Sequence, residues 1–145
     1  MSFFRSISIS GSGLTAQRVR MDVISQNIAN ASTTRTADGT PYRRRVTVFS
    51  PQDSAAGFTG YLNREYDMQT QGVKVTAIQA DPTPLKRVYD PEHPDADATG
   101  YVNLPNVDVT KEMIDMISAT RAYEANVTAL NASKAMAMKA LDIGR

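Results

Sequence analysis

The residues of this sequence best suited to chemistry lie in a short acidic segment around its single histidine. His93 stands within Asp-Pro-Glu-His-Pro-Asp-Ala-Asp, residues 90–97, so that carboxylates flank an imidazole on both sides. Imidazole and carboxylate groups are both ligands of divalent metals. However, the prolines make the segment stiff and turn-like, and its acidic side chains do not recur on one face of a helix. We interpret the segment as an exposed polar loop and expect no metal ligand in it.

The same region begins like the calcium-binding loop of an EF-hand. Residues 95–106 carry Asp at the first and third positions of such a loop. The fifth position is Thr99 in place of Asp or Asn, and the twelfth is Asn106 in place of a bidentate Glu. A calcium site is therefore not expected. A metal-dependent enzyme that uses the His93 region stays open as an alternative.

Composition and motifs argue against most other classes of function. The chain has no cysteine, which excludes thiol catalysis and thiolate metal sites, and it contains no HExxH motif or nucleophile elbow. Its 16 basic and 15 acidic residues leave a net charge of +1, and the run Arg43–Arg45 has no matching patch elsewhere, so nucleic acid is not an expected partner. We expect a protein that is not an enzyme, with no catalytic residue and no cofactor.

Nothing in the sequence predicts insertion into a membrane. No apolar run approaches the ~20 residues of a membrane span. Near the N-terminus, Arg5 interrupts the apolar residues that a secretory signal would need, so we expect no cleaved signal peptide.

The N-terminal part, residues 1–34, carries an apolar stripe and would help to position any functional surface. Apolar residues recur every seven positions at Ile7, Leu14, Met21 and Ile28, with Ile24 at an intermediate position. This pattern predicts an amphipathic helix over residues 13–30, with a weaker continuation back toward residue 3. Gly11 and Gly13 weaken that continuation by about 1 kcal/mol each, and Ser12 is predicted to cap the helix.

The C-terminal part, residues 106–145, has a longer and more regular stripe. One heptad position reads Val109, Met116, Tyr123, Leu130 and Ala137, and the other reads Met113, Thr120, Val127, Lys134 and Leu141. These spacings predict a helix from about 109 to 142, roughly 50 Å long at 1.5 Å per residue. Asp108 is predicted to cap its start and Gly144 to end it.

The middle part, residues 35–105, contains all seven prolines and reads as a small β-rich insert. Apolar and β-branched runs predict strands over residues 46–49, 72–78 and 85–89, and residues 52–61 read as an exposed loop. The predicted fold is therefore mainly α, with long terminal helices that pair as a coiled coil around a small β segment. Because the insert is too small to cover both apolar stripes, a subunit that polymerises through its helices is one interpretation. A free-standing helical hairpin with an inserted cap is the other.

Several segments resemble the flagellar rod and hook proteins. Ser10–Arg18 and Asn27–Thr34 resemble their N-terminal signature, and Glu112–Ala119 and Arg121–Asn126 resemble their C-terminal signature. Within that group, further segments resemble the proximal-rod proteins: Pro41–Arg44, Tyr89–Asp97 with Gly100–Val102, Pro105–Asp108 and Lys139–Gly144. A paralogous rod or hook subunit, or a soluble helical adaptor, is the alternative.

The resemblance implies a structural subunit of a hollow, torque-transmitting rod in the periplasm. Such a subunit is made in the cytoplasm and exported through the flagellar type III apparatus without a cleaved signal. The partners it implies are the rod proteins FlgB, FlgF and FlgG, the junction protein FliE, and further copies of the chain. The residues expected to pack within and between subunits are Leu14, Met21, Ile24, Ile28, Asn30, Met113, Met116, Tyr123, Asn126, Val127, Leu130 and Leu141.

Overall fold

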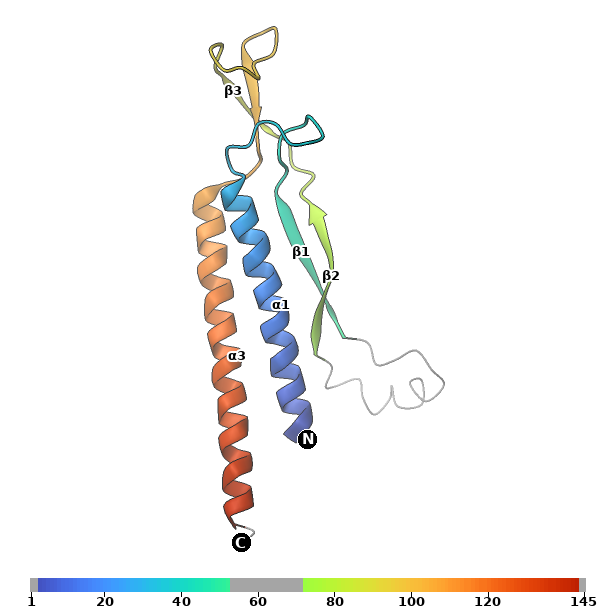
Figure 1. The fold of residues 1–145 in the computed structure, drawn as a ribbon, viewed down its shortest axis with the longest axis vertical. Coiled ribbons are helices and arrows are strands. Elements are labelled where there is room, and N and C mark those ends of the chain that lie inside the picture. Colours follow the sequence, from blue (N-terminus) through green and yellow to red (C-terminus); the bar gives the residue numbers. More distant parts are fainter. Residues whose placement is uncertain (1–2, 53–71, 144–145) are drawn as a thin grey trace, which may run out of the picture.

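A computed structural model describes residues 3–52 and 72–143 of the 145-residue chain. Two long helices, α1 (Phe3–Ala29) and α3 (Val109–Ile143), run antiparallel side by side (Figure 1). The predicted architecture, terminal helices around a small β-rich middle, is confirmed. Neither of these helices is long and apolar enough to cross a membrane.

The middle part forms two antiparallel hairpins. The first pairs β1 (Arg45–Pro51) with β2 (Val73–Ala80), from Arg45 opposite Ala80 to Pro51 opposite Val73, with an irregularity after Val48. The second pairs β3 (Lys86–Tyr89) with β4 (Tyr101–Leu104). The β1–β2 hairpin lies along α1 on the side away from α3, and β3–β4 stands beyond the helix ends (Figure 1). As a result, α1 is covered on two sides.

The three predicted strands are confirmed with small shifts in their ends, and β4 was not predicted. β4 is defined by its pairing with β3, from Lys86 opposite Leu104 to Tyr89 opposite Tyr101. The loop predicted over residues 52–61 lies outside the described residues, except for the exposed Gln52, and so does Gly144.

Of the two predicted helix caps, the one at the start of α3 is confirmed and the one at the start of α1 is wrong. The Asp108 carboxylate accepts hydrogen bonds from the backbone N–H groups of Thr110 (2.9 Å) and Lys111 (3.4 Å), which confirms the predicted cap of α3. The predicted cap at Ser12 is wrong, because α1 already begins at Phe3. Inside the helix, the Ser12 hydroxyl instead donates to the Ile9 carbonyl (2.7 Å) and accepts from the Val73 N–H (3.1 Å). A tertiary contact with β2 therefore occupies the oxygen that a cap would have used.

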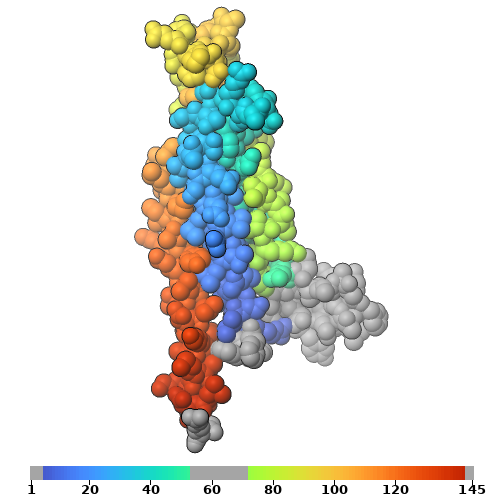
Figure 2. All heavy atoms as spheres, viewed as in Figure 1, coloured from blue at the N-terminus to red at the C-terminus, as the bar shows by residue number. Residues whose placement is uncertain are grey.

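The core of this elongated molecule (Figure 2) is small and partly polar. The only large side chains that are fully buried among the described residues are Glu112, Asn27 and Pro105. On α3 the most buried line is Glu112, Ala119, Asn126 and Ser133, spaced seven apart, and the predicted line through Met116, Tyr123, Leu130 and Ala137 lies half-buried beside it. The most buried line lies one residue before the predicted line Met113, Thr120, Val127, Lys134 and Leu141. The predicted period is therefore right, and the predicted phase of this line is off by one residue.

Candidate functional site

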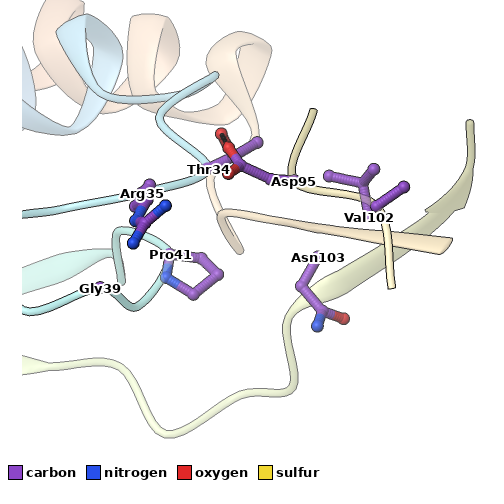
Figure 3. Close-up of a pocket in the computed structure, with 8 residues that line it drawn as sticks. Thr34, Arg35, Gly39, Pro41, Asp95, Val102 and Asn103 are labelled. Carbon is purple, nitrogen blue, oxygen red and sulfur yellow. Dashed lines mark hydrogen bonds between the residues drawn. The ribbon is translucent and has the colours of Figure 1, made fainter. Parts of the chain in front are cut away.

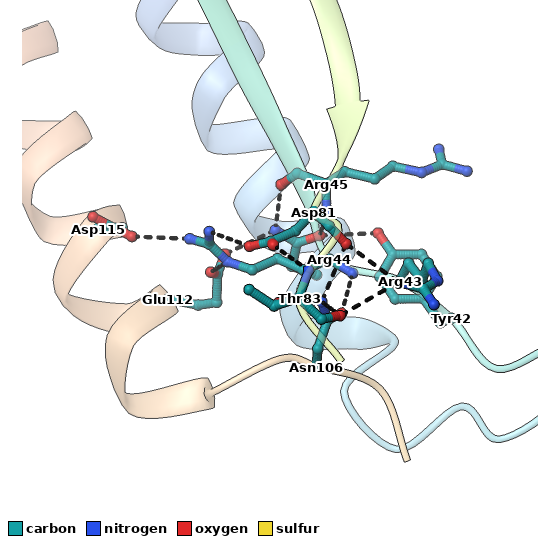
Figure 4. A network of polar contacts seen from close by, with 10 residues as sticks. Tyr42, Arg43, Arg44, Arg45, Asp81, Thr83, Asn106, Glu112 and Asp115 are labelled. Atoms are coloured by element: carbon teal, nitrogen blue, oxygen red, sulfur yellow. Dashed lines mark hydrogen bonds and ion pairs between the residues drawn. The ribbon is translucent and has the colours of Figure 1, made fainter. Parts of the chain in front are cut away.

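The most strongly connected group of side chains lies where α1, α3 and the start of β1 meet. We call this group the polar junction (Figure 4); its members are Asn27, Tyr42, Arg44, Asp81, Asn106, Glu112 and Asp115. These residues come from both helices, from the segment entering β1, and from the loops that follow β2 and precede α3. The junction therefore joins parts of the chain that are far apart in the sequence.

Asn27 is the centre of the junction and is only 1% exposed. Its amide nitrogen donates to the Glu112 carboxylate and to the Arg45 carbonyl, both at 2.9 Å. Its amide oxygen accepts from the Tyr42 hydroxyl (3.0 Å) and the Arg45 N–H (2.9 Å). Two donor hydrogens and two acceptor positions are thus all used, which is the full capacity of an asparagine side chain. Burial of its ring raises the pKa of Tyr42, so this hydroxyl remains a hydrogen-bond donor at neutral pH.

Glu112 is the buried charge of the junction, with none of its surface exposed. Its second oxygen accepts a hydrogen bond of 2.6 Å from Nε of Arg44. Burial favours a lower pKa for the Arg44 guanidinium, but the hydrogen bonds and charges of Glu112 and Asp81 outweigh it and raise the pKa. A buried carboxylate is tolerated when a cation and further hydrogen bonds compensate it, and both are present here.

Arg44 also extends the junction outward to two other carboxylates. Its terminal nitrogens lie 3.4 Å from Asp81 and 3.4 Å from Asp115, and Asp115 in turn lies 3.5 Å from Arg20 of α1. Hydrogen bonds from Thr83, together with the Arg44 charge, lower the pKa of Asp81. These outer pairs are partly exposed, so each contributes less than the Arg44–Glu112 pair.

Asn106 connects the segment before α3 to the rest of the junction. Its carbonyl oxygen accepts from the Arg44 N–H at 2.8 Å, and its amide nitrogen donates to the Thr83 hydroxyl at 2.7 Å. The arrangement holds five segments of the chain in one relative position.

The acidic segment that drew attention in the sequence is a structured turn. The His93 Nδ1 accepts from the Asp95 N–H at 3.1 Å, and Asp97 accepts from Thr99 and Tyr101. These hydrogen bonds, with the nearby Arg87 charge, lower the pKa of Asp97 to about 2. Over residues 3–52 and 72–143, no group of three or more His, Asp or Glu side chains could hold a metal ion.

A shallow cavity of about 290 Å³ lies between this turn and the segment that follows α1 (Figure 3). Thr34 and Asp95 close one side of it through a 2.7 Å hydrogen bond between their side chains. Asp95 is the only acidic residue among those that line the cavity, and the cationic Arg35 lines it too, so the lining contains no acidic cluster to hold a cation.

The residues predicted to pack within and between subunits are spread over several environments. Ile24 is buried, whereas Met113 and Leu141 are 55% and 75% exposed in the single chain. The others are half-buried, namely Leu14, Met21, Ile28, Asn30, Met116, Tyr123, Asn126, Val127 and Leu130. Within the chain, the Thr120 hydroxyl contacts the Met21 sulfur at 3.7 Å.

Sequence reasoning did not single out Asn27, Arg44 or Glu112 as a site. A signal was nevertheless present, because each of them lies in a segment that resembles the rod proteins. Polar residues at otherwise apolar helix positions, such as Asn27 beside Ile24 and Ile28, are a second signal that could have identified them.

Comparisons with known proteins found matches to two family models and to several relatives. Residues 7–35 match the family model described as "Flagella basal body rod protein", and residues 98–143 match "Flagellar basal body rod FlgEFG protein C-terminal". The chain is 52% identical to the flagellar basal-body rod protein FlgC of Borreliella burgdorferi, over 99% of this chain and 98% of that protein. It is 50% identical to FlgC of Bacillus subtilis and 41% identical to FlgC of Salmonella typhimurium, each over the full length of both proteins.

Proposed function

Because the chain belongs to the FlgC family of flagellar basal-body rod proteins, we propose that it is a structural subunit of the proximal rod of the bacterial flagellar basal body. The observation that carries this proposal is the match to FlgC relatives at 41–52% identity along 99–100% of the chain. The subunit catalyses nothing, and its work is mechanical: it transmits torque through a hollow shaft.

Polymerisation in this proposal takes place through the terminal parts, residues 1–34 and 106–145, with residues 35–105 as the insert between them. The helices pair as a coiled coil, and the stripe on α3 that includes Val109, Met113 and Ile117 packs on neighbouring subunits. Support comes from its exposure, because Met113 and Ile117 are each 55% exposed although they are large and apolar. A contact between two different surfaces of identical subunits produces a helical filament when its rotation does not close into a ring.

The proposal extends to location and partners through the family. The chain is exported through the flagellar type III apparatus without a cleaved signal and assembles in the periplasm. Its neighbours are copies of itself, the rod proteins FlgB, FlgF and FlgG, and the junction protein FliE. The residues that pack within and between subunits are those predicted from the sequence, with Met113 and Leu141 available for contacts between subunits because they are exposed in the single chain.

Deletion and complementation test the proposal. A strain that lacks this chain should not swim and should yield basal bodies without rods, and expression of the chain from a plasmid should restore both. Mass spectrometry of the purified basal bodies should then detect the chain. Complete rods and normal swimming in the deletion strain would contradict the proposal.

A further inference from the structure

We infer that Arg44 makes the pairing of α1 with α3 conditional on docking of the β1–β2 hairpin. The inference deepens the proposed function, because in that function the paired helices are the polymerising element. Without the hairpin, the helix pair would have to bury the Glu112 carboxylate with no cation beside it. With the hairpin docked, Arg44 supplies that cation.

The helix seam contains little fully buried apolar surface to drive pairing by itself. The most buried line of α3 is a Glu, an Ala, an Asn and a Ser, the apolar line beside it is only half-buried, and the buried apolar side chains of the two helices are Ala16, Val23, Ile24 and Ala119. Hydrophobic stabilisation is roughly proportional to the apolar area removed from water, and alanine contributes little of it. Pairing therefore depends strongly on how Glu112 is accommodated.

Glu112 has two partners. Arg44 belongs to the segment that enters β1, and Asn27 belongs to α1 but is held by hydrogen bonds from that segment. One oxygen accepts from Arg44 Nε (2.6 Å) and the other from the Asn27 amide (2.9 Å). The other hydrogen bonds of Asn27 within this segment go to the Arg45 backbone and the Tyr42 hydroxyl. If this segment left α1, Glu112 would lose its cation and Asn27 would lose three of its four hydrogen bonds. Removing one member of a buried ion pair is strongly unfavourable.

The position of Arg44 in turn depends on the hairpin. The Arg44 carbonyl accepts from the Asp81 N–H at 2.8 Å, directly next to the first β1–β2 pair, Arg45 with Ala80. Its own N–H donates to Asn106 at 2.8 Å. The guanidinium is therefore brought to Glu112 (Figure 4) by the pairing of two strands that lie on the side of α1 away from α3 (Figure 1). Hairpin docking and helix pairing are linked through this one side chain.

Distance measurements on the free, full-length chain test the inference. The chain has no cysteine, so Ser25→Cys in α1 and Ser118→Cys in α3, both exposed positions, can each carry a spin label. Pulsed electron resonance should give a narrow, short distance distribution for this labelled parent. Arg44→Met should broaden that distribution and shift it to longer distances, because Glu112 has lost its cation.

A second variant separates this coupling from simple misfolding. Adding Glu112→Met to Arg44→Met removes the buried charge, so the narrow, short distance should return. Arg20→Met is the matched control and should leave the distribution unchanged, because the carboxylate that Arg20 pairs with among the described residues is the partly exposed Asp115.

A parent-like distribution in Arg44→Met, a broad distribution in the parent, or no recovery in the double variant would each overturn the inference. All measurements are made without a rod. A failure here therefore leaves the deletion and complementation test unaffected, and a failure of that test leaves these distances unaffected.

Discussion

Gly13 of α1 faces the side chain of Asn126 of α3 at a distance that leaves no room for a β-carbon. A β-carbon on residue 13 would lie 2.9 Å from the Asn126 side-chain oxygen. Fourteen residues later in α1 and fourteen residues earlier in α3, Asn27 contacts Glu112. Two contacts separated by two heptads on both helices define a single antiparallel register, one by close approach and the other by hydrogen bonding.

The close approach at Gly13 predicts different outcomes for the two glycines of α1. Gly11→Ala should stabilise the chain by about 0.5–1 kcal/mol, because nothing lies within 4 Å of the added carbon and alanine favours the helix. Gly13→Ala should be less stable than Gly11→Ala by about 1 kcal/mol or more, because Asn126 is fixed by a 2.8 Å bond to the Ala122 carbonyl. Urea unfolding measures both. Equal stability of the two variants would show that the seam tolerates a wider spacing.

The exposed stripe of α3 predicts a variant that folds and fails to assemble. Met113→Asp should change the free energy of unfolding of the free chain by no more than about 0.5 kcal/mol, because the residue is largely exposed. It should nevertheless abolish swimming and rod completion, because a charge in an apolar contact between subunits is costly. Ser118→Asp, at another exposed position of the same helix, is the control and should swim. Complete rods in the Met113→Asp strain would show that this stripe is not part of the assembly surface.

Ser12 is predicted to hold the start of β2 on α1. Ser12→Ala removes the oxygen that accepts the Val73 N–H, at a cost of about 1 kcal/mol. Hydrogen exchange at the Val73 amide should become faster than in the parent. Thr15→Ala, which removes only a bond from the hydroxyl to the Gly11 carbonyl of the same helix, should leave that amide unchanged. If both variants protect Val73 equally well, the hydroxyl does not hold the strand.

The turn around Asp97 is predicted to loosen in acid. Its pKa of about 2 in the folded chain lies below the unfolded value of about 3.9, so the ionised carboxylate stabilises the turn fully above about pH 4. That contribution is lost as the pH falls through about 2. The Thr99 and Tyr101 amide signals in NMR spectra should shift across this range in the parent. In Asp97→Asn, whose side chain does not titrate, the same two amide signals should not shift. Shifts that match those of the parent would show that another group titrates in this range.

The sequence was sufficient to predict the elements whose signals are local. The seven-residue repeats predicted both terminal helices, and Asp108 was correctly assigned as a cap. Alternation predicted β2, and apolar and β-branched runs predicted β1 and β3. Each of these depends on residues within a few positions of one another. In contrast, β4 was not predicted, and it is defined by its pairing with β3, which comes from an earlier part of the chain.

Only the tertiary structure decided which side of α3 meets α1. A heptad repeat gives the period of a buried line but not its phase when apolar residues occupy several lines, as they do here. The most buried line of α3 contains Glu112 and Asn126 because their partners, Asn27, Arg44 and Gly13, come from distant parts of the chain. The sequence of α3 alone gives no reason to bury a carboxylate, because a buried charge without a partner is costly. The folded chain supplies that partner and the hydrogen bonds from residues outside α3.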